Sequence, residues 1–249
     1  MQKFGLIGQK LNHSFSKSFF SKKFADENIN AKYYNFEIEN ISQLKNIFQK
    51  EVISGMNVTI PYKKSVIGQL DSLDEISNKI KAVNTILPTY HNNKLIHLKG
   101  FNTDAYGFHQ MIKPYLKSHH EKALIFGTGG ASAAVSYVLK NYNIDINYVS
   151  RTKYSKNNNT FLWSEINKYF IESHLLLINT TPIGMFPNCN QEIKIPYNYL
   201  TQNHLVIDLI YNPIETLFLK QASENNAKVL NGYQMLINQA MKAWNIWNK

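Results

Sequence analysis

The stretch ALIFGTGGASAAVSYVL (123–139) decides the fold that we predict for this chain. It begins as an apolar run with strand character, turns at a group of glycines, and continues through small residues into a segment with helical character. Glycines permit a tight turn and let backbone N–H groups approach a pyrophosphate, which the positive end of the next helix stabilises. This context favours a dinucleotide-binding turn over an ordinary βα turn. We assign to cofactor binding Gly127, Thr128, Gly129, Gly130 and Ala131.

Around this turn, the second half of the chain reads as a parallel sheet. Its strand-like segments are nearly continuous apolar runs, as expected where helices cover both faces of a sheet. They are ALIFG (123–127), INYVS (146–150), LLLINTT (175–181) and LVIDLIY (205–211). The pattern predicts a Rossmann-type dinucleotide-binding domain.

The first half shows a second α/β rhythm. Short β-favouring runs occur at 3–8, 32–38 and 55–60, and segments with helical spacing separate them at 16–29 and 41–52. NTILPTY (84–90) and KLIHLKG (94–100) then flank HNN (91–93), which indicates an antiparallel hairpin. The sequence therefore predicts an α/β protein with two units.

The break between the two series lies near residues 101–121. GFNTDAYGFHQMIKPYLKSHHEK (100–122) reads as a helix that enters the second domain and ends at Pro114 or just beyond it. We predict a first domain over 1–102, a dinucleotide-binding domain over 103–231, and a C-terminal helix over 232–249.

Composition narrows the class of protein. Hydrophobic residues make up 44% and charged residues 18%, which is typical of a globular chain and not of a disordered one. The single cysteine, Cys189, excludes an internal disulfide and a thiolate metal cluster, so we expect a reducing compartment. No signal-peptide pattern and no apolar run long enough to span a bilayer is evident, and we expect a cytoplasmic protein without membrane contact.

The net charge of +10 comes from 27 Lys plus Arg against 17 Asp plus Glu. Such a balance could serve nucleic acid, anionic lipid or an anionic small substrate. The lysines are scattered without a dense basic stripe, so we expect a solvated basic surface and no nucleic-acid partner. The eight histidines show no HExxH motif or paired ligand spacing, and we expect no metal.

The end of the second strand of the parallel sheet indicates which nicotinamide cofactor is used. An Asp or Glu at this point would bind the ribose 2′-hydroxyl of NAD. Here the chain instead reads Ser150, Arg151, Thr152 and Lys153. A guanidinium without a neighbouring carboxylate suits the extra 2′-phosphate of NADP(H), which we therefore favour as the cofactor.

A further motif, SGMNVTIPYKKS (54–65), reads as a strand that stops at Pro61 and is followed by Lys63 and Lys64. Taken with other segments in order, it resembles the shikimate dehydrogenase family. The motifs that carry the resemblance are NHSFS (12–16), NVTIPYK (57–63), AVNTI (82–86), GFNTDAYG (100–107), FGTGGAS (126–132), SRT (150–152), NTTPIGM (179–185), DLIYNPIET (208–216) and GYQMLINQA (232–240).

The resemblance implies reversible NADPH-dependent reduction of 3-dehydroshikimate to shikimate, in the route to aromatic amino acids. It implies an N-terminal substrate-binding domain, a Rossmann-type domain, and an active site in the cleft between them. Lys63 takes the family's proton-transfer role and Asp104 is its partner. The chemistry is consistent, because hydride reduction of a ketone develops negative charge on oxygen that a proton-donating cation stabilises.

The resemblance also implies the binding residues. Ser14 and Ser16 would hold the substrate carboxylate as uncharged donors. Positions that contact the ring hydroxyls, or lie beside them, are Thr59, Asn84, Asp104, Tyr211 and Gln239. Positions near the nicotinamide side are Asn179, Thr180, Met185, Leu209 and Gly232. The last helix would return to the first domain and bring Gln239 to the active site, whereas His13 is expected to be structural.

The chain departs from the family pattern in three places. HSFSKSFF lacks the proline and histidine that commonly follow HSxS, Lys81 stands where a glycine is common, and SRTKYSK lacks the second arginine often found near the 2′-phosphate. Lys153 or Lys156 could replace that arginine. Alternatives left open are a relative that uses quinate or NAD, and a non-catalytic protein that binds a nucleotide or polyol. Monomer and homodimer are both compatible with the sequence.

Overall fold

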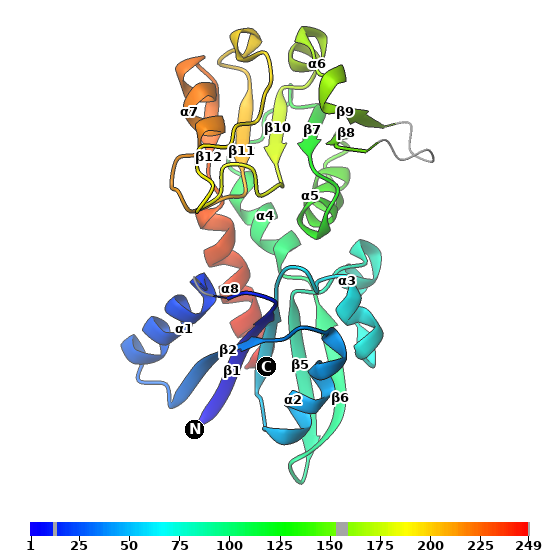
Figure 1. The fold of residues 1–249 in the computed structure, drawn as a ribbon, viewed down its shortest axis with the longest axis vertical. Coiled ribbons are helices and arrows are strands. Elements are labelled where there is room, and N and C mark those ends of the chain that lie inside the picture. Colours follow the sequence, from blue (N-terminus) through cyan, green and yellow to red (C-terminus); the bar gives the residue numbers. More distant parts are fainter. Residues whose placement is uncertain (12–13, 153–158, 249) are drawn as a thin grey trace. The chain divides into compact units, whose positions relative to one another are not determined.

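The computed structural model describes residues 1–11, 14–152 and 159–248, and these form two compact units (Figure 1). The first unit is Met1–Thr103 with Gln239–Lys249, and the second is Asp104–Asn238. Each unit contains a six-stranded sheet. The first division lies one residue from the boundary expected after residue 102. The second lies within the last helix instead of before it, because that helix continues without a break from Tyr233 to Trp247.

The sheet of the first unit is mixed, in the order β2-β1-β3-β5-β6-β4. Strands β1, β2 and β3 run parallel, whereas β5 and β6 form the antiparallel hairpin expected from the sequence. Asn92 and Asn93 connect the hairpin with positive φ angles of 50° and 60°, which asparagine tolerates in tight turns. The strands are Gln2–Gly8 (β1), Ala31–Glu37 (β2), Gly55–Val58 (β3), Ser72–Leu73 (β4), Thr85–His91 (β5) and Lys94–Phe101 (β6).

The helices of this unit pack large aromatic side chains against the sheet. Phe4, Phe20 and Trp247 are buried together, and the Trp247 indole donates a hydrogen bond to the Ile86 carbonyl at 3.1 Å. A Cβ on Gly55 would overlap the Trp247 ring, so a glycine is required at that point of β3. The helices are Phe15–Asp26 (α1), Leu44–Lys50 (α2), Glu75–Ile80 (α3) and the later turns of Tyr233–Trp247 (α8), with short 3-10 turns at Ile41–Gln43 (η1) and Ser65–Gln69 (η2).

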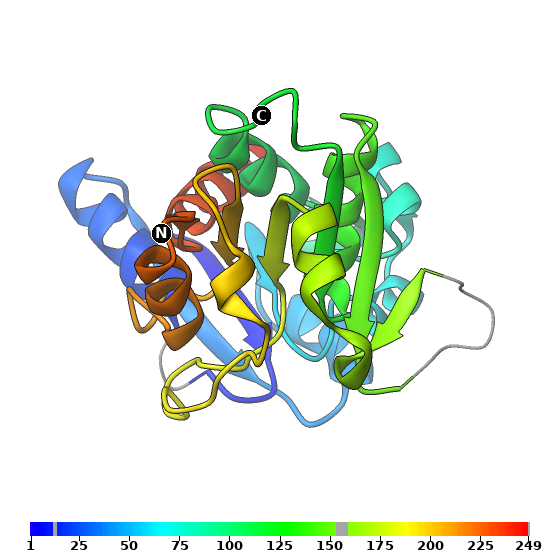
Figure 2. The same cartoon turned by 90° about the horizontal axis from the view of Figure 1, so that it is seen from above.

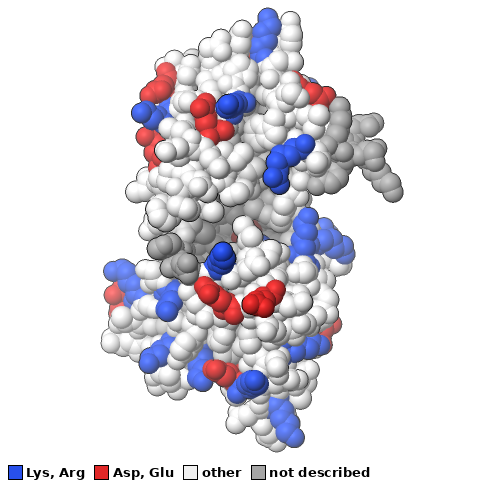
Figure 3. Space-filling view, in the orientation of Figure 1, with Lys and Arg blue, Asp and Glu red and all other residues white. Residues whose placement is uncertain are grey.

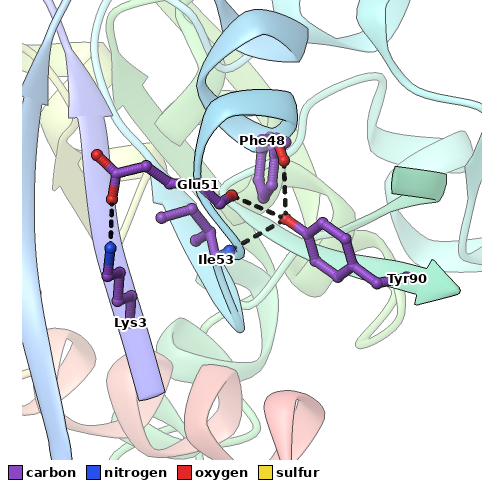
Figure 4. Close-up of polar contacts among 5 residues, drawn as sticks. All are labelled: Lys3, Phe48, Glu51, Ile53 and Tyr90. Atoms are coloured by element: carbon purple, nitrogen blue, oxygen red, sulfur yellow. Dashed lines mark hydrogen bonds and ion pairs between the residues drawn. The ribbon is translucent and has the colours of Figure 1, made fainter. Parts of the chain in front are cut away.

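One hydroxyl joins α2 to the hairpin of this unit. The Tyr90 hydroxyl accepts from the Ile53 N–H at 3.0 Å and lies 3.2 Å from the Phe48 carbonyl and 3.3 Å from the Glu51 carbonyl (Figure 4). Glu51 also pairs with Lys3 at 2.9 Å, an exposed ion pair of small worth. Tyr90 therefore fixes the chain between α2 and β3, near the turn end of the hairpin.

The sheet of the second unit is entirely parallel, in the order β12-β11-β10-β7-β8-β9. Numbered from β7 along the chain, this is the order 3-2-1-4-5-6 of a Rossmann-type domain, which confirms the predicted fold class. The strands are Lys122–Phe126 (β7), Asp145–Ser150 (β8), Thr160–Leu162 (β9), Leu176–Asn179 (β10), Leu205–Asp208 (β11) and Lys228–Leu230 (β12).

Helices cover both faces of this sheet (Figure 2). Phe126, Leu177 and Val206 point to the face that also buries Ile171 of α6 and Phe218 of α7. The other face is covered by α4 and α5, which contact each other. The helices are Asp104–Ile112 (α4), Gly130–Lys140 (α5), Lys168–Ser173 (α6) and Leu217–Glu224 (α7), with 3-10 turns at Trp163–Glu165 (η3) and Tyr197–Tyr199 (η4).

Two strands are shorter than expected. The run 205–211 was expected as one strand, but β11 ends at Asp208 because its carboxylate accepts the Ile210 N–H at 3.0 Å and turns the chain. Likewise β10 ends at Asn179, whose side-chain oxygen accepts the Thr181 N–H at 2.9 Å. In both cases a polar side chain replaces a ladder hydrogen bond.

The described residues form neither a membrane-spanning helix nor a cluster of metal ligands. Within 1–11, 14–152 and 159–248 the structure has no helix of the length and apolarity that a bilayer crossing requires. The same ranges contain no group of three or more His, Cys, Asp or Glu placed to hold a metal ion. On the face drawn in Figure 3, Lys and Arg side chains lie singly or in small groups with acidic residues between them.

Three buried histidines precede strands of the second sheet. His120 precedes β7, His174 precedes β10 and His204 precedes β11, so all three lie at its amino-terminal edge. Each has one ring nitrogen beside a backbone carbonyl, at 3.2 Å from Asn203, 2.7 Å from Phe170 and 3.0 Å from Ile171 respectively. Burial lowers the pKa of each imidazole below 6.5, despite these carbonyls.

We expect these histidines to make the second unit labile to mild acid. A histidine with a lowered folded-state pKa stabilises the fold while neutral, so its contribution is complete above about pH 6.5 and declines below it. The slope is at most about 1.4 kcal/mol per pH unit for each proton taken up on unfolding. Buried Asp208, with its pKa raised to about 6, opposes the decline below that pH.

Urea unfolding at pH 7.5, 6.5 and 5.5 measures the effect. A free energy of unfolding that is flat or rises toward pH 5.5 contradicts this expectation, and single His→Gln variants should each reduce the slope.

Candidate functional site

Several of the polar residues expected to bind substrate follow or precede strand ends along one edge of the first sheet. Register places Ile7, Val58, Thr85 and Phe101 at neighbouring strand ends, because β1 and β3 run parallel while β5 begins and β6 ends at the same edge. These predicted residues belong to the segments that continue from these ends. They are Ser14 and Ser16 after β1, Thr59 and Lys63 after β3, Asn84 before β5, and the chain leading to Asp104 after β6.

The Asn84 side chain joins several segments at this edge through hydrogen bonds. Its side-chain oxygen accepts the Thr103 N–H at 2.7 Å, and its amide nitrogen donates to the Thr103 hydroxyl at 3.0 Å. The same nitrogen donates to Gln239 Oε1 at 2.9 Å, so the last helix is joined to the edge by a predicted binding residue. Asn84 is 2% exposed, which makes these polar contacts strong determinants of local geometry.

The segment that carries Lys63 is held on both sides. The Lys63 carbonyl accepts the Val83 N–H at 2.7 Å, and the Tyr62 hydroxyl donates to the Ile38 carbonyl at 2.6 Å. Lys63 is half-buried, whereas its neighbour Lys64 is exposed. Asp104, buried at 3% exposure, directly follows Thr103 and is the first residue of α4 in the second unit.

The two predicted carboxylate-binding serines lie at the start of α1. Ser14 caps the helix, since its hydroxyl oxygen accepts the Lys17 N–H at 3.1 Å. That bond does not use the hydroxyl proton. Ser16 is the second residue of the helix, is half-buried, and lies beside the buried Tyr33, whose pKa it lowers as a polar neighbour. The expected structural role of His13 falls on a residue outside the described ranges.

In the second unit the predicted cofactor residues follow the carboxyl ends of the parallel strands, where α/β sheets bind ligands. Gly127 directly follows β7 and has a φ angle of +103°, and its N–H donates to the Val149 carbonyl at 2.9 Å. A Cβ there would lie 2.8 Å from the Thr180 hydroxyl. Gly129 is the N-cap of α5 with φ at −81°, and a Cβ there would meet no atom within 4 Å.

These two glycines therefore serve different purposes. Gly127 is required by the turn itself, whereas Gly129 leaves open space in front of the N-terminus of α5. Gly130 is the first residue of that helix, and Thr128 and Ala131 flank the turn. Open space before a helix N-terminus suits a bound anion.

The chain beyond β8 carries the residues expected to distinguish NADP from NAD. Ser150 ends the strand, its hydroxyl accepts the Thr152 N–H at 3.4 Å, and Arg151 between them is exposed. Arg151 is the only arginine among the 249 residues. Lys153 and Lys156, also named as possible phosphate ligands, fall outside the described ranges.

Asn179 and Asp208, at the ends of β10 and β11, form a buried pair. Asn179 donates to Asp208 at 3.0 Å, and the same carboxylate accepts from the Thr216 hydroxyl at 2.7 Å. Burial raises the pKa of Asp208 to about 6, although these bonds oppose the rise. Sequence reasoning assigned no role to Asp208 or Thr216. The available signal was a lone carboxylate at the end of an otherwise apolar strand.

The remaining predicted cofactor residues, and the predicted substrate residue Tyr211, lie in the loops that follow β10, β11 and β12. The Thr180 hydroxyl donates to the Phe126 carbonyl at 2.7 Å, and the Leu209 N–H donates to the Asn179 carbonyl at 3.0 Å. A Cβ on Gly232 would overlap the Leu209 carbonyl, so glycine is needed where β12 leads into α8. Met185 is 39% exposed in the loop after β10, and Tyr211 is half-buried in the loop after β11.

Comparison with known proteins places the chain in a family. The sequence model described as "Shikimate dehydrogenase substrate binding domain" matches residues 6–86. The shikimate dehydrogenase (NADP(+)) of Methanosphaera stadtmanae is 36% identical over 261 residues, covering 98% of this chain and 90% of the relative. The crystal structure of shikimate dehydrogenase 1 from Peptoclostridium difficile is 36% identical with a TM-score of 0.82, covering 100% of this chain and 92% of that one.

A second solved structure carries both ligands. It is shikimate 5-dehydrogenase from Thermus thermophilus in complex with NADP(H) and shikimate, 25% identical with a TM-score of 0.83, covering 99% of this chain and 93% of that one. The similarity thus extends over both units of the chain and is not confined to the matched N-terminal range. By its sequence and its fold, this chain belongs to the shikimate dehydrogenase family.

Proposed function

We propose that this chain catalyses the reversible NADPH-dependent reduction of 3-dehydroshikimate to shikimate. The observation that carries the proposal is the whole-chain similarity to a shikimate dehydrogenase (NADP(+)), at 36% identity over 98% of the chain. The first unit is the proposed substrate-binding domain and the second the proposed cofactor-binding domain. The convergence of polar residues at strand ends in each unit supports this division.

The second unit fits NADP(H) in three respects. The turn at Gly127 and Gly129 leaves room for a pyrophosphate before α5, the chain after β8 has no carboxylate to oppose a 2′-phosphate, and Arg151 supplies an exposed guanidinium there. When bound, NADPH supplies the hydride. Asn179, Thr180, Met185, Leu209 and Gly232 are the proposed residues on the nicotinamide side.

The first unit supplies the proposed proton donor. Lys63 donates a proton from its ammonium group to the carbonyl oxygen of the substrate as that oxygen gains negative charge, and Asp104 orients the ammonium. The segments that carry these two residues are both attached to the consecutive residues Val83 and Asn84. The Lys63 carbonyl accepts the Val83 N–H, and Thr103, which precedes Asp104, donates its N–H to the Asn84 side chain. In the reverse direction Lys63 takes the proton back.

Substrate recognition is assigned to uncharged polar groups. Ser14 and Ser16 are the proposed donors to the substrate carboxylate, at the N-terminal start of α1, where the helix dipole also favours an anion. Gln239 has its amide oxygen fixed by Asn84, which directs its amide nitrogen as a donor to a ring hydroxyl. Thr59 and Tyr211 complete the proposed set.

We expect Gly129→Ala to weaken NADP binding without loss of stability. Its backbone angles and the space around a Cβ accept alanine in the free protein. A methyl group there would occupy the space proposed for the pyrophosphate, and we expect the KM for NADP to rise by about tenfold or more. Thermal unfolding of the free protein should stay within about 1 °C of the parent. An unchanged KM would mean that the pyrophosphate lies elsewhere.

The function is tested by following nicotinamide absorbance when the purified chain meets shikimate. Parallel mixtures contain NADP or NAD, and quinate in place of shikimate. We expect rapid reduction of NADP with shikimate, and slower reaction in every other mixture. Faster turnover of quinate or NAD would assign the chain to the relative with that preference. No reduction by folded protein, together with measurable shikimate binding in calorimetry, would make it a binding protein.

A further inference from the structure

Tyr33, on β2, has a buried hydroxyl in the first unit that no step above uses. Its side chain is 4% exposed and its ring stacks on Phe20, with centroids 4.9 Å apart and planes 9° from parallel. Burial raises the pKa of the phenol well above 10.0, with an opposing effect of the polar neighbour Ser16, so the hydroxyl keeps its proton. A neutral phenol both donates and accepts one or more hydrogen bonds.

The partners of this hydroxyl determine what it can do. It donates to Asn57 Oδ1 at 2.8 Å, and Ser16 on α1 lies beside it and lowers its pKa as a polar neighbour. Asn57 in turn donates from its amide nitrogen to the Asn84 carbonyl and to the Thr85 hydroxyl, both at 3.2 Å. Both polar atoms of the Asn57 side chain are thus bonded to protein groups, so Asn57 connects Tyr33 to Asn84 and Thr85.

The chain of contacts continues to the other candidate binding residues. Thr85 hydrogen-bonds to Asn84 Oδ1 at 3.2 Å, and Asn84 holds Gln239 on α8. A continuous path of hydrogen bonds therefore runs from Tyr33 on β2 through β3 and the start of β5 to α8, and Ser16 of α1 lies beside its first member. Apolar core surrounds it, with Phe20 and Met56 among the fully buried side chains. In such surroundings an unpaired polar atom is costly, which fixes the orientation of each member.

We propose that Tyr33 is a positioning residue that links the serine assigned to the substrate carboxylate with the Asn84–Gln239 pair assigned to the ring hydroxyls. The inference rests on the proposed function, since Ser16, Asn84 and Gln239 receive these roles there. Tyr33 holds Asn57 by its hydrogen bond and lies beside Ser16, so that one side chain sets the positions of groups assigned to carboxylate and to hydroxyl recognition. Its effect falls on substrate binding and not on the cofactor.

The test is Tyr33→Phe, which removes one oxygen and keeps the ring stacked on Phe20. We expect the KM for shikimate to rise about tenfold, as for the loss of one buried hydrogen bond. The kcat should stay within about threefold of the parent, and the KM for NADP should be unchanged. Tyr90→Phe is the control, because it removes a half-buried tyrosine hydroxyl with backbone partners in the same unit, away from the candidate residues. It should lower stability and leave both KM values unchanged.

A second comparison distinguishes positioning from a general loss of order. If Tyr33 acts through Ser16, Tyr33→Phe should add little to the KM change already produced by Ser16→Ala, so the two effects are strongly non-additive. The discrimination between shikimate and its methyl ester, which lacks the carboxylate charge, should also shrink in Tyr33→Phe. Should Tyr33→Phe not fold, Phe20→Leu loosens the ring without removing the hydroxyl and should raise the same KM.

The outcomes separate the inference from the function on which it rests. A parent chain without shikimate-dependent reduction overturns the proposed function. An active parent whose Tyr33→Phe variant keeps its KM for shikimate, or whose two substitutions add fully, overturns the positioning role alone. Equal KM changes in Tyr33→Phe and Tyr90→Phe would reduce Tyr33 to a structural residue.

Discussion

Lys63→Ala is expected to lower kcat by about 10² to 10⁴, the usual contribution of a general acid or base, while the KM for shikimate changes less than fivefold. The reason is that the ammonium is needed most when negative charge develops on the substrate oxygen, and less when the ground state binds. The backbone contribution of Lys63 survives the substitution, because the bond to Val83 uses its carbonyl. Steady-state rates in both directions measure the effect.

Lys64→Ala is the matched control for this variant. Lys64 is the adjacent residue and an exposed lysine, so its removal changes net charge and local sequence by the same amount. We expect it to retain kcat within about twofold. Turnover of Lys63→Ala close to that of Lys64→Ala would remove Lys63 from the mechanism. An equal fall in both would indicate a general electrostatic effect on an anionic substrate.

The fold could be predicted where the pattern is local. The parallel sheet followed from continuous apolar runs, and the hairpin followed from two β-favouring segments around HNN, whose Asn92 and Asn93 adopt positive φ. The glycine turn before α5 was placed correctly because the conformations glycine allows are a property of one residue and its neighbours.

Contacts between residues distant in sequence could not be predicted from local patterns, although the family resemblance did imply that the last helix returns to the first unit. The Tyr33–Asn57 bond spans 24 positions and the Asn84–Gln239 bond 155, and periodicity carries no information on such pairs. Asp208 was read as part of a strand because its neighbours are apolar. Its carboxylate ends the strand by bonding to Asn179 and Thr216, which only the assembled sheet places beside it. The roles assigned to individual site residues remain predictions.

Arg151→Ala is expected to raise the KM for NADP by about 10- to 100-fold and to change the KM for NAD by less than threefold. A guanidinium makes two charge-assisted hydrogen bonds with a phosphate, each stronger than a neutral hydrogen bond. NAD has no 2′-phosphate, so its binding does not depend on these bonds. No other arginine exists in the chain to replace it. Because the side chain is exposed, the substitution should not alter stability.

Two further variants separate geometry from charge at this position. Arg151→Lys keeps the charge and loses the planar pair of donors, so its NADP preference should fall between those of the parent and Arg151→Ala. Lys140→Ala removes an exposed positive charge at the end of α5 and should leave both cofactors unaffected. Equal losses for NADP and NAD in Arg151→Ala would show that this residue does not contact the 2′-phosphate. Selectivity would then have to come from other residues after β8, with Lys153 and Lys156 the next positions to substitute.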